Sequence, residues 1–265
     1  HARTFMKAVI SGGRLDWFQS AAAGIEHPAF VMIGKMANQF TTNHRQSEAM
    51  SEWALWQALD YFRQGPKHRA QQAAGAWDSL DSREIRGSKW LIVGFGSIGS
   101  STGRRVMALG GQVTGVKRSH GRVKGADRIV HPDDVMAELP DADVVLVCVP
   151  HTPETEGMAN ADFFAAMKPD ALFMNLGRGA LVNEPDLMAT LDAGRPGHAA
   201  LDVASEEPLP QDNPLWTHPK ITLTAHDSSQ THGTVIGADD TFIENLHRYF
   251  NGEPLKHLID KSEFA

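Results

Sequence analysis

Three side chains with catalytic potential each come shortly after a short apolar run in the C-terminal half of the chain: Arg178, Glu207 and His226. If these runs are parallel strands, the three side chains emerge at the same carboxyl edge of one sheet, where α/β proteins bind their ligands. A guanidinium can hold a substrate carboxylate through two parallel hydrogen bonds. The neighbouring Glu206 is an alternative to Glu207 as the inward-facing carboxylate. The spacing predicts one catalytic cleft.

A glycine-rich turn separates an apolar run from a helical pattern earlier in the chain. Its sequence is Gly94-Phe-Gly96-Ser-Ile-Gly99. In this context the first glycine permits a tight turn, the second lets the backbone approach a pyrophosphate, and the third allows close helix packing. The unpaired N–H groups of the helix N-terminus, at Ser97 and Ile98, would face the phosphates. The motif predicts a dinucleotide site.

The residues after the next apolar run bear on the choice of cofactor. An acidic residue there would bind the ribose hydroxyls of NAD and repel a 2'-phosphate. The chain instead has Lys117, Arg118 and Ser119, two cations and a hydroxyl that suit a dianionic phosphate. A solvated basic loop is the alternative. We predict NADP(H), with NAD(H) as the other possible cofactor.

A further loop follows the apolar run at residues 143–149. Val149, Pro150 and Thr155 lie in it, and at the carboxyl edge of a sheet this loop would flank the cofactor. His151 in the same loop is interpreted as a packing or cofactor-flanking residue. No metal ligand is predicted.

Predicted strands and helices alternate in the part of the chain that would position these residues. Apolar runs alternate with helix-compatible spacing from Lys89 onward, which is typical of a parallel sheet with crossover helices. The predicted strands are 90–94, 112–116, 143–149, 171–175, 198–203 and 221–224, and the predicted helices are 100–109, 132–139, 160–167 and 184–191. The pattern predicts an α/β fold with a doubly wound, Rossmann-type sheet.

An earlier segment, residues 47–62, has an apolar surface too wide for a helix with one face in water. It contains Trp53, Trp56 and Phe62 among other apolar residues. A core helix and a subunit interface both fit this pattern, and we predict a homodimer formed through this helix.

Composition limits the classes of partner. The 265 residues carry a formal net charge of -7, so there is no global attraction to nucleic acid or to an anionic membrane. Cys148 is the only cysteine, and no stretch of eighteen apolar residues occurs, which argues against disulfides and membrane insertion. These properties predict a cytoplasmic enzyme with a small-molecule ligand.

Taken with these motifs, the chain resembles the D-isomer-specific 2-hydroxyacid dehydrogenases, the family that includes glyoxylate and hydroxypyruvate reductases. The resemblance extends over nearly the whole chain. Its matching segments are Leu15–Gly24, Glu84–Gly99, those around Arg178 and Glu207, Asn213–Trp216 with the histidine turn after it, Glu244–Leu246 and Gly252–Leu255.

The resemblance implies a role for each of the trio Arg178, Glu207 and His226. Arg178 would anchor the substrate carboxylate and polarise its carbonyl, His226 would donate a proton to the ketone oxygen, and Glu207 would hold that histidine. The implied activity is reduction of a small 2-keto acid, such as glyoxylate or hydroxypyruvate, to a D-2-hydroxy acid. A non-catalytic NAD(P)-binding regulatory protein of the same fold is the alternative.

The resemblance also implies contacts outside the trio. Asp202 matches a residue on the nicotinamide side of the cofactor, and the backbone at Ala23 and Gly24 matches the loop that receives the substrate carboxylate. The family usually has Thr-Pro-His before the catalytic turn, whereas this chain has Thr-Ala225-His followed by Asp227-Ser-Ser.

The implied organisation has two domains. Residues 1–44 and 228–265 would form a smaller, flavodoxin-like substrate domain, and residues 45–227 the dinucleotide-binding domain, including the dimer helix at 47–63. The front of the substrate domain is shorter than in the family. The expectation is a longer native protein, with coverage of the short domain by a partner subunit as the alternative.

Overall fold

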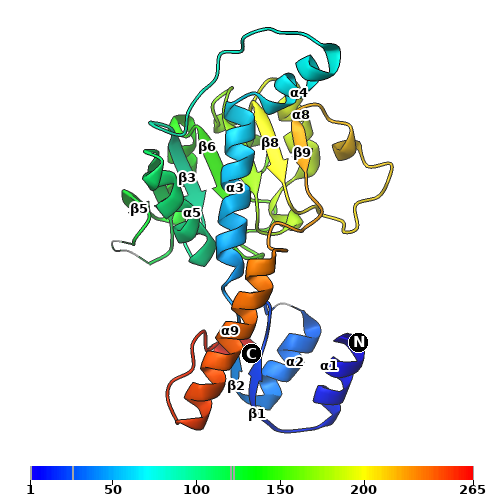
Figure 1. Ribbon diagram of the computed structural model, residues 1–265, viewed down its shortest axis with the longest axis vertical. Helices are drawn as coiled ribbons and strands as arrows, with labels where there is room; N and C mark the ends of the chain where they lie inside the picture. The colour runs from blue at the N-terminus through cyan, green and yellow to red at the C-terminus, as the bar shows by residue number, and fades with distance from the viewer. Residues whose placement is uncertain (1, 26, 120, 122, 265) are drawn as a thin grey trace. The chain divides into compact units, whose positions relative to one another are not determined.

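The computed structural model describes residues 2–25, 27–119, 121 and 123–264 (Figure 1). The chain divides into two compact units. The small unit comprises His1–Gln46 and Gln230–Ala265, and the large unit comprises Ser47–Ser229.

The large unit is built on a seven-stranded parallel sheet with the order β5-β4-β3-β6-β7-β8-β9. The strands are β3 (Lys89–Val93), β4 (Gln112–Val116), β5 (Arg128–Val130), β6 (Val144–Val147), β7 (Leu172–Asn175), β8 (His198–Leu201) and β9 (Ile221–Leu223). The order reverses at β3, where the chain leaves for β4 on one side and later continues with β6 on the other. The predicted doubly wound sheet is confirmed.

Helices cover the sheet in the large unit (Figure 1). The helices of this unit are α3 (Gln46–Phe62), α4 (Gly65–Ala74), α5 (Ser97–Ala108), α6 (Val135–Glu138), α7 (Ala161–Ala166) and α8 (Glu184–Asp192), with short 3-10 turns η1 (Pro132–Asp134), η2 (Leu139–Asp141), η3 (Gly179–Leu181) and η4 (Pro214–Trp216). Helix α4 has no buried residue and does not cover the sheet. Both faces of the sheet are buried, which explains why its strands are continuous apolar runs rather than alternating ones.

Strand β3 contributes side chains to the hydrophobic clusters on both faces of the sheet. Leu91 and Val93 belong to the hydrophobic cluster on one face, whereas Trp90 and Ile92 belong to the cluster on the other. Successive strand residues point to opposite faces, so this run stabilises both layers at once.

The sequence did not predict two elements of the large unit. Strand β5 consists of Arg128, Ile129 and Val130 and was not predicted, whereas β9, of the same length, was. Helix α4 begins at Gly65, just after the end of the helix predicted at 47–63, and no helix was predicted there. Its second residue is a proline, whose fixed φ suits the first turn of a helix.

The small unit contains two parallel strands, β1 (Leu15–Gln19) and β2 (Ala37–Thr41). Its helices are α1 (Ala2–Ser11), α2 (Pro28–Met36) and α9 (His232–Phe250), followed by the 3-10 turn η5 (Lys261–Phe264). Ile33, Phe40 and Phe264 form the centre of its core. In the part of the chain that the structure describes, no helix combines the length and apolarity needed to cross a bilayer.

Candidate active site

The glycine-rich turn joins β3 to α5 and leaves the N-terminus of α5 open. Gly94 has a φ of +104°, and a Cβ there would lie 2.7 Å from the Cys148 carbonyl oxygen. A Cβ on Gly96 would meet nothing within 4 Å, and no side chain caps α5 among the described residues. The turn thus requires glycine at Gly94, and it leaves space beside Gly96 where a ligand could approach the backbone.

The basic residues predicted to bind phosphate follow the end of β4. The Lys117 N–H bonds to the Val130 carbonyl at 3.1 Å, which extends the pairing of β4 and β5. Arg118 and Ser119 are exposed. Within the described ranges neither Lys117 nor Arg118 forms an ion pair with an acidic group. A hydrogen bond from Thr152 and, as a smaller cause, the charge of Arg118 lower the pKa of the exposed Glu154.

The loop after β6 is closed by a threonine. Thr155 Oγ1 accepts a hydrogen bond from the Thr152 N–H at 2.8 Å and donates one to the Pro150 carbonyl at 2.8 Å. His151 lies 3.7 Å from Glu156. Just before this loop, burial raises the pKa of the Cys148 thiol to about 12, so this thiol is not a nucleophile.

Arg178 stands on a loop that a buried asparagine fixes. Asn175, the last residue of β7, is fully buried. Its Oδ1 accepts a bond from the Gly177 N–H at 2.9 Å, and its Nδ2 donates to the Arg178 carbonyl at 2.9 Å. The half-buried Arg178 side chain donates from Nη1 to the Gly177 carbonyl at 2.8 Å.

The loop of Arg178 lies against the loop that contains Glu207. Gly179 packs so closely on the Ala204 backbone that a Cβ would collide with it. The carboxylate of Glu184, 8% exposed, accepts bonds from the N–H and hydroxyl of Ser205 at 2.7 and 2.8 Å. Glu184 was missed by sequence reasoning, although its position at the first turn of a helix was visible.

Glu207 and His226 are in direct contact. The carboxylate oxygen Oε2 of Glu207 lies 2.7 Å from Nδ1 of His226, and its Oε1 accepts a bond from the Ala204 N–H at 3.0 Å. Both side chains are partly exposed, at 38% and 47%. Of the two candidate carboxylates, it is Glu207 rather than Glu206 that makes this contact.

A buried aspartate organises the turn that carries His226. Asp202, 1% exposed, accepts bonds through Oδ1 from the Thr224 hydroxyl at 2.6 Å and from the Asp227 N–H at 3.1 Å. The Ser228 N–H lies 3.2 Å from each of its carboxylate oxygens. Thr224 Oγ1 in turn accepts a bond from the Trp53 indole at 3.0 Å. A chain of hydrogen bonds therefore links α3 to the histidine turn.

The other predicted substrate contacts, Ala23 and Gly24, belong to the small unit. They follow β1, in a loop held by bonds from the Asn43 N–H to the Ala22 carbonyl at 3.1 Å and from Gln46 Nε2 to the Ala21 carbonyl at 3.0 Å. Among the described residues no acceptor pairs with the N–H groups of Ala23 and Gly24.

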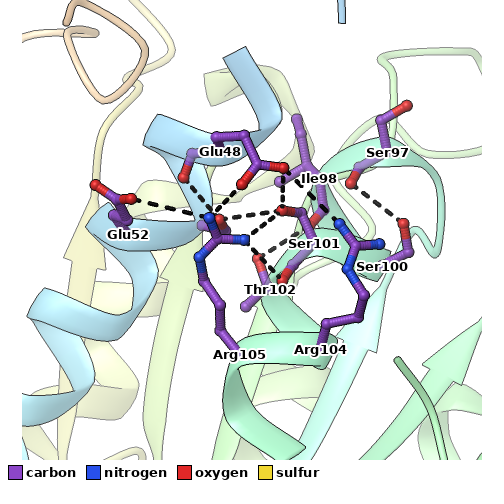
Figure 2. Close-up of polar contacts among 10 residues, drawn as sticks. Glu48, Glu52, Ser97, Ile98, Ser100, Ser101, Thr102, Arg104 and Arg105 are labelled. Atoms are coloured by element: carbon purple, nitrogen blue, oxygen red, sulfur yellow. Dashed lines mark hydrogen bonds and ion pairs between the residues drawn. The ribbon is translucent and has the colours of Figure 1, made fainter. Parts of the chain in front are cut away.

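A polar cluster between α3 and α5 was also missed by sequence reasoning. Figure 2 shows the Glu48 carboxylate directed at the guanidinium groups of Arg104 and Arg105 and at the Ser101 hydroxyl. The hydrogen bond from Arg105 is the largest cause that lowers the pKa of Glu48. Because α5 carries the glycine-rich turn at its N-terminus, this cluster fixes the position of that helix relative to α3.

Comparisons with known proteins agree with this architecture. The family model for the D-isomer specific 2-hydroxyacid dehydrogenase, NAD binding domain, matches residues 55–228. A glyoxylate/hydroxypyruvate reductase A of Serratia proteamaculans is 34% identical over 185 residues, 70% of this chain and 59% of that protein. One of Yersinia enterocolitica is 30% identical over 211 residues, 80% of this chain and 67% of that protein. The matched part thus spans about three fifths to two thirds of the length of these relatives.

Solved structures show the same likeness over more of the chain. A D-isomer specific 2-hydroxyacid dehydrogenase family protein from Aeromonas salmonicida is 34% identical with a TM-score of 0.80, covering 93% of this chain and 79% of that one. An NADPH-dependent glyoxylate/hydroxypyruvate reductase from Sinorhizobium meliloti, solved with NADP and sulfate, is 27% identical with a TM-score of 0.82, covering 95% and 80%. The chain belongs to the D-isomer specific 2-hydroxyacid dehydrogenase family.

Proposed function

We propose that this protein is an NADPH-dependent reductase that converts a small 2-keto acid, of the glyoxylate or hydroxypyruvate type, into a D-2-hydroxy acid. The observation that carries the proposal is the 2.7 Å contact between His226 and Glu207. This contact orients a proton donor at the same edge of the sheet as the glycine-rich turn. The relatives named above as reductases, one of them solved with NADP, support the same assignment.

The residues of the large unit suit a dinucleotide. The open space beside Gly96 and the uncapped N-terminus of α5 fit a pyrophosphate, and Ser97, Ile98 and Gly99 would supply the N–H groups. Lys117, Arg118 and Ser119 would hold the 2'-phosphate that distinguishes NADPH from NADH. The loop with Val149, Pro150 and Thr155 would flank the cofactor. When bound, the cofactor supplies the hydride.

Substrate binding and proton donation would be performed by different side chains. The Arg178 guanidinium would bind the substrate carboxylate through a pair of hydrogen bonds and polarise the adjacent carbonyl. The Nδ1–H of His226 would donate to Glu207, leaving Nε2 to carry the proton that the ketone oxygen receives. Asp202 would lie beside the nicotinamide, and its hydrogen bonds would hold the turn that contains His226. This assignment orients the imidazole before the substrate arrives.

The two units would divide the binding. The large unit would hold the cofactor and the small unit the substrate, whose carboxylate would accept bonds from the N–H groups of Ala23 and Gly24. The exposed Trp56 and Leu59 of α3 support assembly as a homodimer through that helix.

The experiment is a steady-state assay of NADPH oxidation by a panel of 2-keto acids, with chiral analysis of the product. The expected result is turnover of glyoxylate and hydroxypyruvate, with hydroxypyruvate giving D-glycerate. Tight NADPH binding without turnover of any keto acid would instead support a non-catalytic, NAD(P)-binding regulatory protein.

A further inference from the structure

A buried carboxylate of the large unit lies beside the catalytic loops but has no part in the proposed chemistry. Glu184 is 8% exposed and is the first residue of α8. Both of its carboxylate oxygens accept hydrogen bonds from Ser205, Oε1 from the N–H at 2.7 Å and Oε2 from the hydroxyl at 2.8 Å. Bonds to an ionised acceptor are stronger than those between neutral groups, so this pair joins α8 firmly to the segment around Ser205.

The start of α8 gives the Glu184 carboxylate a defined position. Asn183 caps the helix by accepting the Asp186 N–H at 3.1 Å, and Pro185 is the second residue of the helix. Proline suits this place because its fixed φ matches the first turn. The first N–H groups of a helix carry partial positive charge, which stabilises an acidic side chain there. The local sequence therefore explains how a carboxylate can be buried at this point.

The segment that Glu184 binds also holds the carboxylate of Glu207. The Ala204 N–H donates to Glu207 Oε1 at 3.0 Å, and Glu207 Oε2 lies 2.7 Å from His226 Nδ1. Ser205 directly follows Ala204, so the bonds from Glu184 fix the peptide next to the one that Glu207 uses. A continuous series of hydrogen bonds thus leads from α8 to the imidazole.

The loop of Glu207 depends on such contacts for its position. Residues 205–208 are exposed and form bends rather than a helix or strand, and exposed loops of this kind are among the more mobile parts of a fold. A Cβ on Gly179 would lie 1.9 Å from the Ala204 carbonyl carbon, so the loop packs closely on the backbone that follows Arg178. The bonds from Glu184 add a polar attachment to this packing.

Glu184 also joins the loop of Glu207 to the segment that carries Arg178. Only the 3-10 turn η3 and two further residues separate Arg178 from Glu184, and the Asn183 N–H ties this segment to the Ala159 carbonyl at 3.0 Å. A group that connects the two loops therefore keeps the proton donor and the carboxylate anchor at a constant separation. Misplacing a reacting group by about 1 Å can cost roughly 100-fold in rate.

We propose that Glu184 is a positioning residue for the reduction: by holding Ser205 it sets the place of Glu207, and through Glu207 the orientation of the His226 imidazole. This inference rests on the proposed function and adds to it a residue that acts only through Glu207. A role limited to folding would lower the stability of the protein without a specific effect on the catalytic step. The effect of Glu184 should therefore appear in kcat and should require Glu207.

Substitutions of Glu184 test this role in the full chain, by steady-state NADPH oxidation with the best keto acid. Glu184→Ala removes both bonds to Ser205 and should lower kcat about 10- to 100-fold. The KM for the keto acid and the Kd for NADPH should change little, because the groups proposed to bind them remain. Glu184→Gln can still accept the Ser205 N–H and can donate to its hydroxyl, so it should restore most of kcat. A wild-type kcat in Glu184→Ala would overturn the proposal.

Asp186→Ala is the matched control. Asp186 lies in the same first turn of α8, and its carboxylate accepts the N–H of Ala161, the first residue of α7, at 3.0 Å. Its removal should lower the free energy of unfolding in urea without lowering kcat, because α7 carries none of the proposed catalytic residues. Equal losses of kcat in Asp186→Ala and Glu184→Ala would attribute the effect to the stability of α8 and would overturn the positioning role.

A second background separates positioning from a general structural effect. Glu207→Ala lacks the group through which Glu184 is proposed to act, so adding Glu184→Ala should lower kcat little further. Residues that act through one another are non-additive in such a double-mutant cycle. The same fold-loss of kcat from Glu184→Ala in both backgrounds would refute the proposal.

An NMR experiment covers the case in which no keto acid is reduced. The imidazole C2 proton of His226 is identified by its absence in His226→Ala, and its resonance is followed at fixed pH. The resonance should move in Glu184→Ala and stay in place in Asp186→Ala. If it does not move in Glu184→Ala, the positioning role is wrong whether or not keto acids are reduced. If it moves although no keto acid is reduced, Glu184 positions the imidazole and only the proposed function is wrong.

Discussion

The backbone of His226 has a φ of +52°, in the left-handed region that residues other than glycine seldom occupy. Such a conformation costs on the order of 1–3 kcal/mol and persists where surrounding contacts enforce it. Here the His226 N–H bonds to the Asp202 carbonyl at 2.8 Å, while the Asp202 carboxylate accepts the N–H groups of the next two residues. The turn is therefore fixed by one buried residue, although it lacks the proline that the family usually has before the histidine.

The trio makes a prediction at the residue scale. His226→Ala and Arg178→Ala should each lower kcat/KM for the best keto acid by about 10²–10⁴-fold, because they remove the proton donor or the carboxylate anchor. NADPH binding, followed by fluorescence, should persist. His68→Ala, an exposed histidine of α4, is the matched control. Near-wild-type turnover in either site variant would refute the roles given to these residues.

The proposed preference for NADPH over NADH can also be tested at a single residue, Arg118. Arg118→Ala should lower kcat/KM for NADPH about 10- to 100-fold, because a charge-assisted bond to phosphate contributes roughly 1.5–3 kcal/mol. The value for NADH, which lacks the phosphate, should change little. Lys124→Ala, which removes another exposed cation, serves as the control. A wild-type enzyme that uses NADH better than NADPH would contradict the assignment.

At the scale of elements, α3 and the histidine turn are joined by one threonine. Thr224→Val keeps the shape of the side chain but removes the hydroxyl that accepts from Trp53 and donates to Asp202. The free energy of unfolding in urea should fall by about 1–3 kcal/mol, since both partners lose a buried bond, and kcat should fall as the turn loosens. Thr217→Val, at an exposed hydroxyl, should change neither quantity. Unchanged kcat and stability in Thr224→Val would show that the link has no role.

The start of β8 carries a half-buried histidine, His198, that makes stability depend on pH. Burial is the largest cause that lowers the pKa of His198 from its ordinary 6.5 to about 4. As the pH falls below 6.5 the unfolded chain binds this proton first, so the contribution to stability is complete above pH 6.5 and is lost between 6.5 and 4. The loss should approach about 3 kcal/mol.

Urea unfolding across that pH range measures the effect of His198. His198→Gln keeps a polar partner for the Thr222 hydroxyl, which lies 2.9 Å from the ring, and does not titrate. The variant should therefore show a shallower decline of stability than the wild type. Parallel declines in the two proteins would show that His198 is not the group responsible.

For the molecule as a whole, the exposed apolar residues of α3 predict self-association. Trp56 and Leu59 are 54% and 43% exposed, although neighbouring Trp53 and Ala54 pack in the core. The wild type should elute at twice the 28.9 kDa mass of the chain in light-scattering chromatography. Trp56→Glu with Leu59→Glu should yield monomers, because a buried charge in an interface is strongly unfavourable. Met136→Glu, at a residue 47% exposed on α6, is the control, and a monomeric wild type would exclude the proposed dimer.

Much of the fold was predictable from sequence because its signals are local. Strands such as β3 and β6 are runs of apolar residues, and the glycine-rich turn lies in one short segment between β3 and α5. A parallel sheet places all strand ends at one edge, so the sequence also placed Arg178, Glu207 and His226 on the same edge. Strand β5 was not predicted, although β9 of the same length was. Helix α4 was not predicted because none of its residues is buried, so its sequence has no apolar stripe.

What the sequence by itself determined was therefore the doubly wound sheet and the set of residues at its carboxyl edge. The tertiary structure decided which of them touch. It selected Glu207 over Glu206 as the partner of His226, turned Asp202 toward the histidine turn, joined Trp53 to Thr224, and stacked His44 on His257. These contacts join residues from 19 to more than 200 positions apart. Backbone twist and side-chain packing set their geometry, and no short-range pattern in a sequence records either.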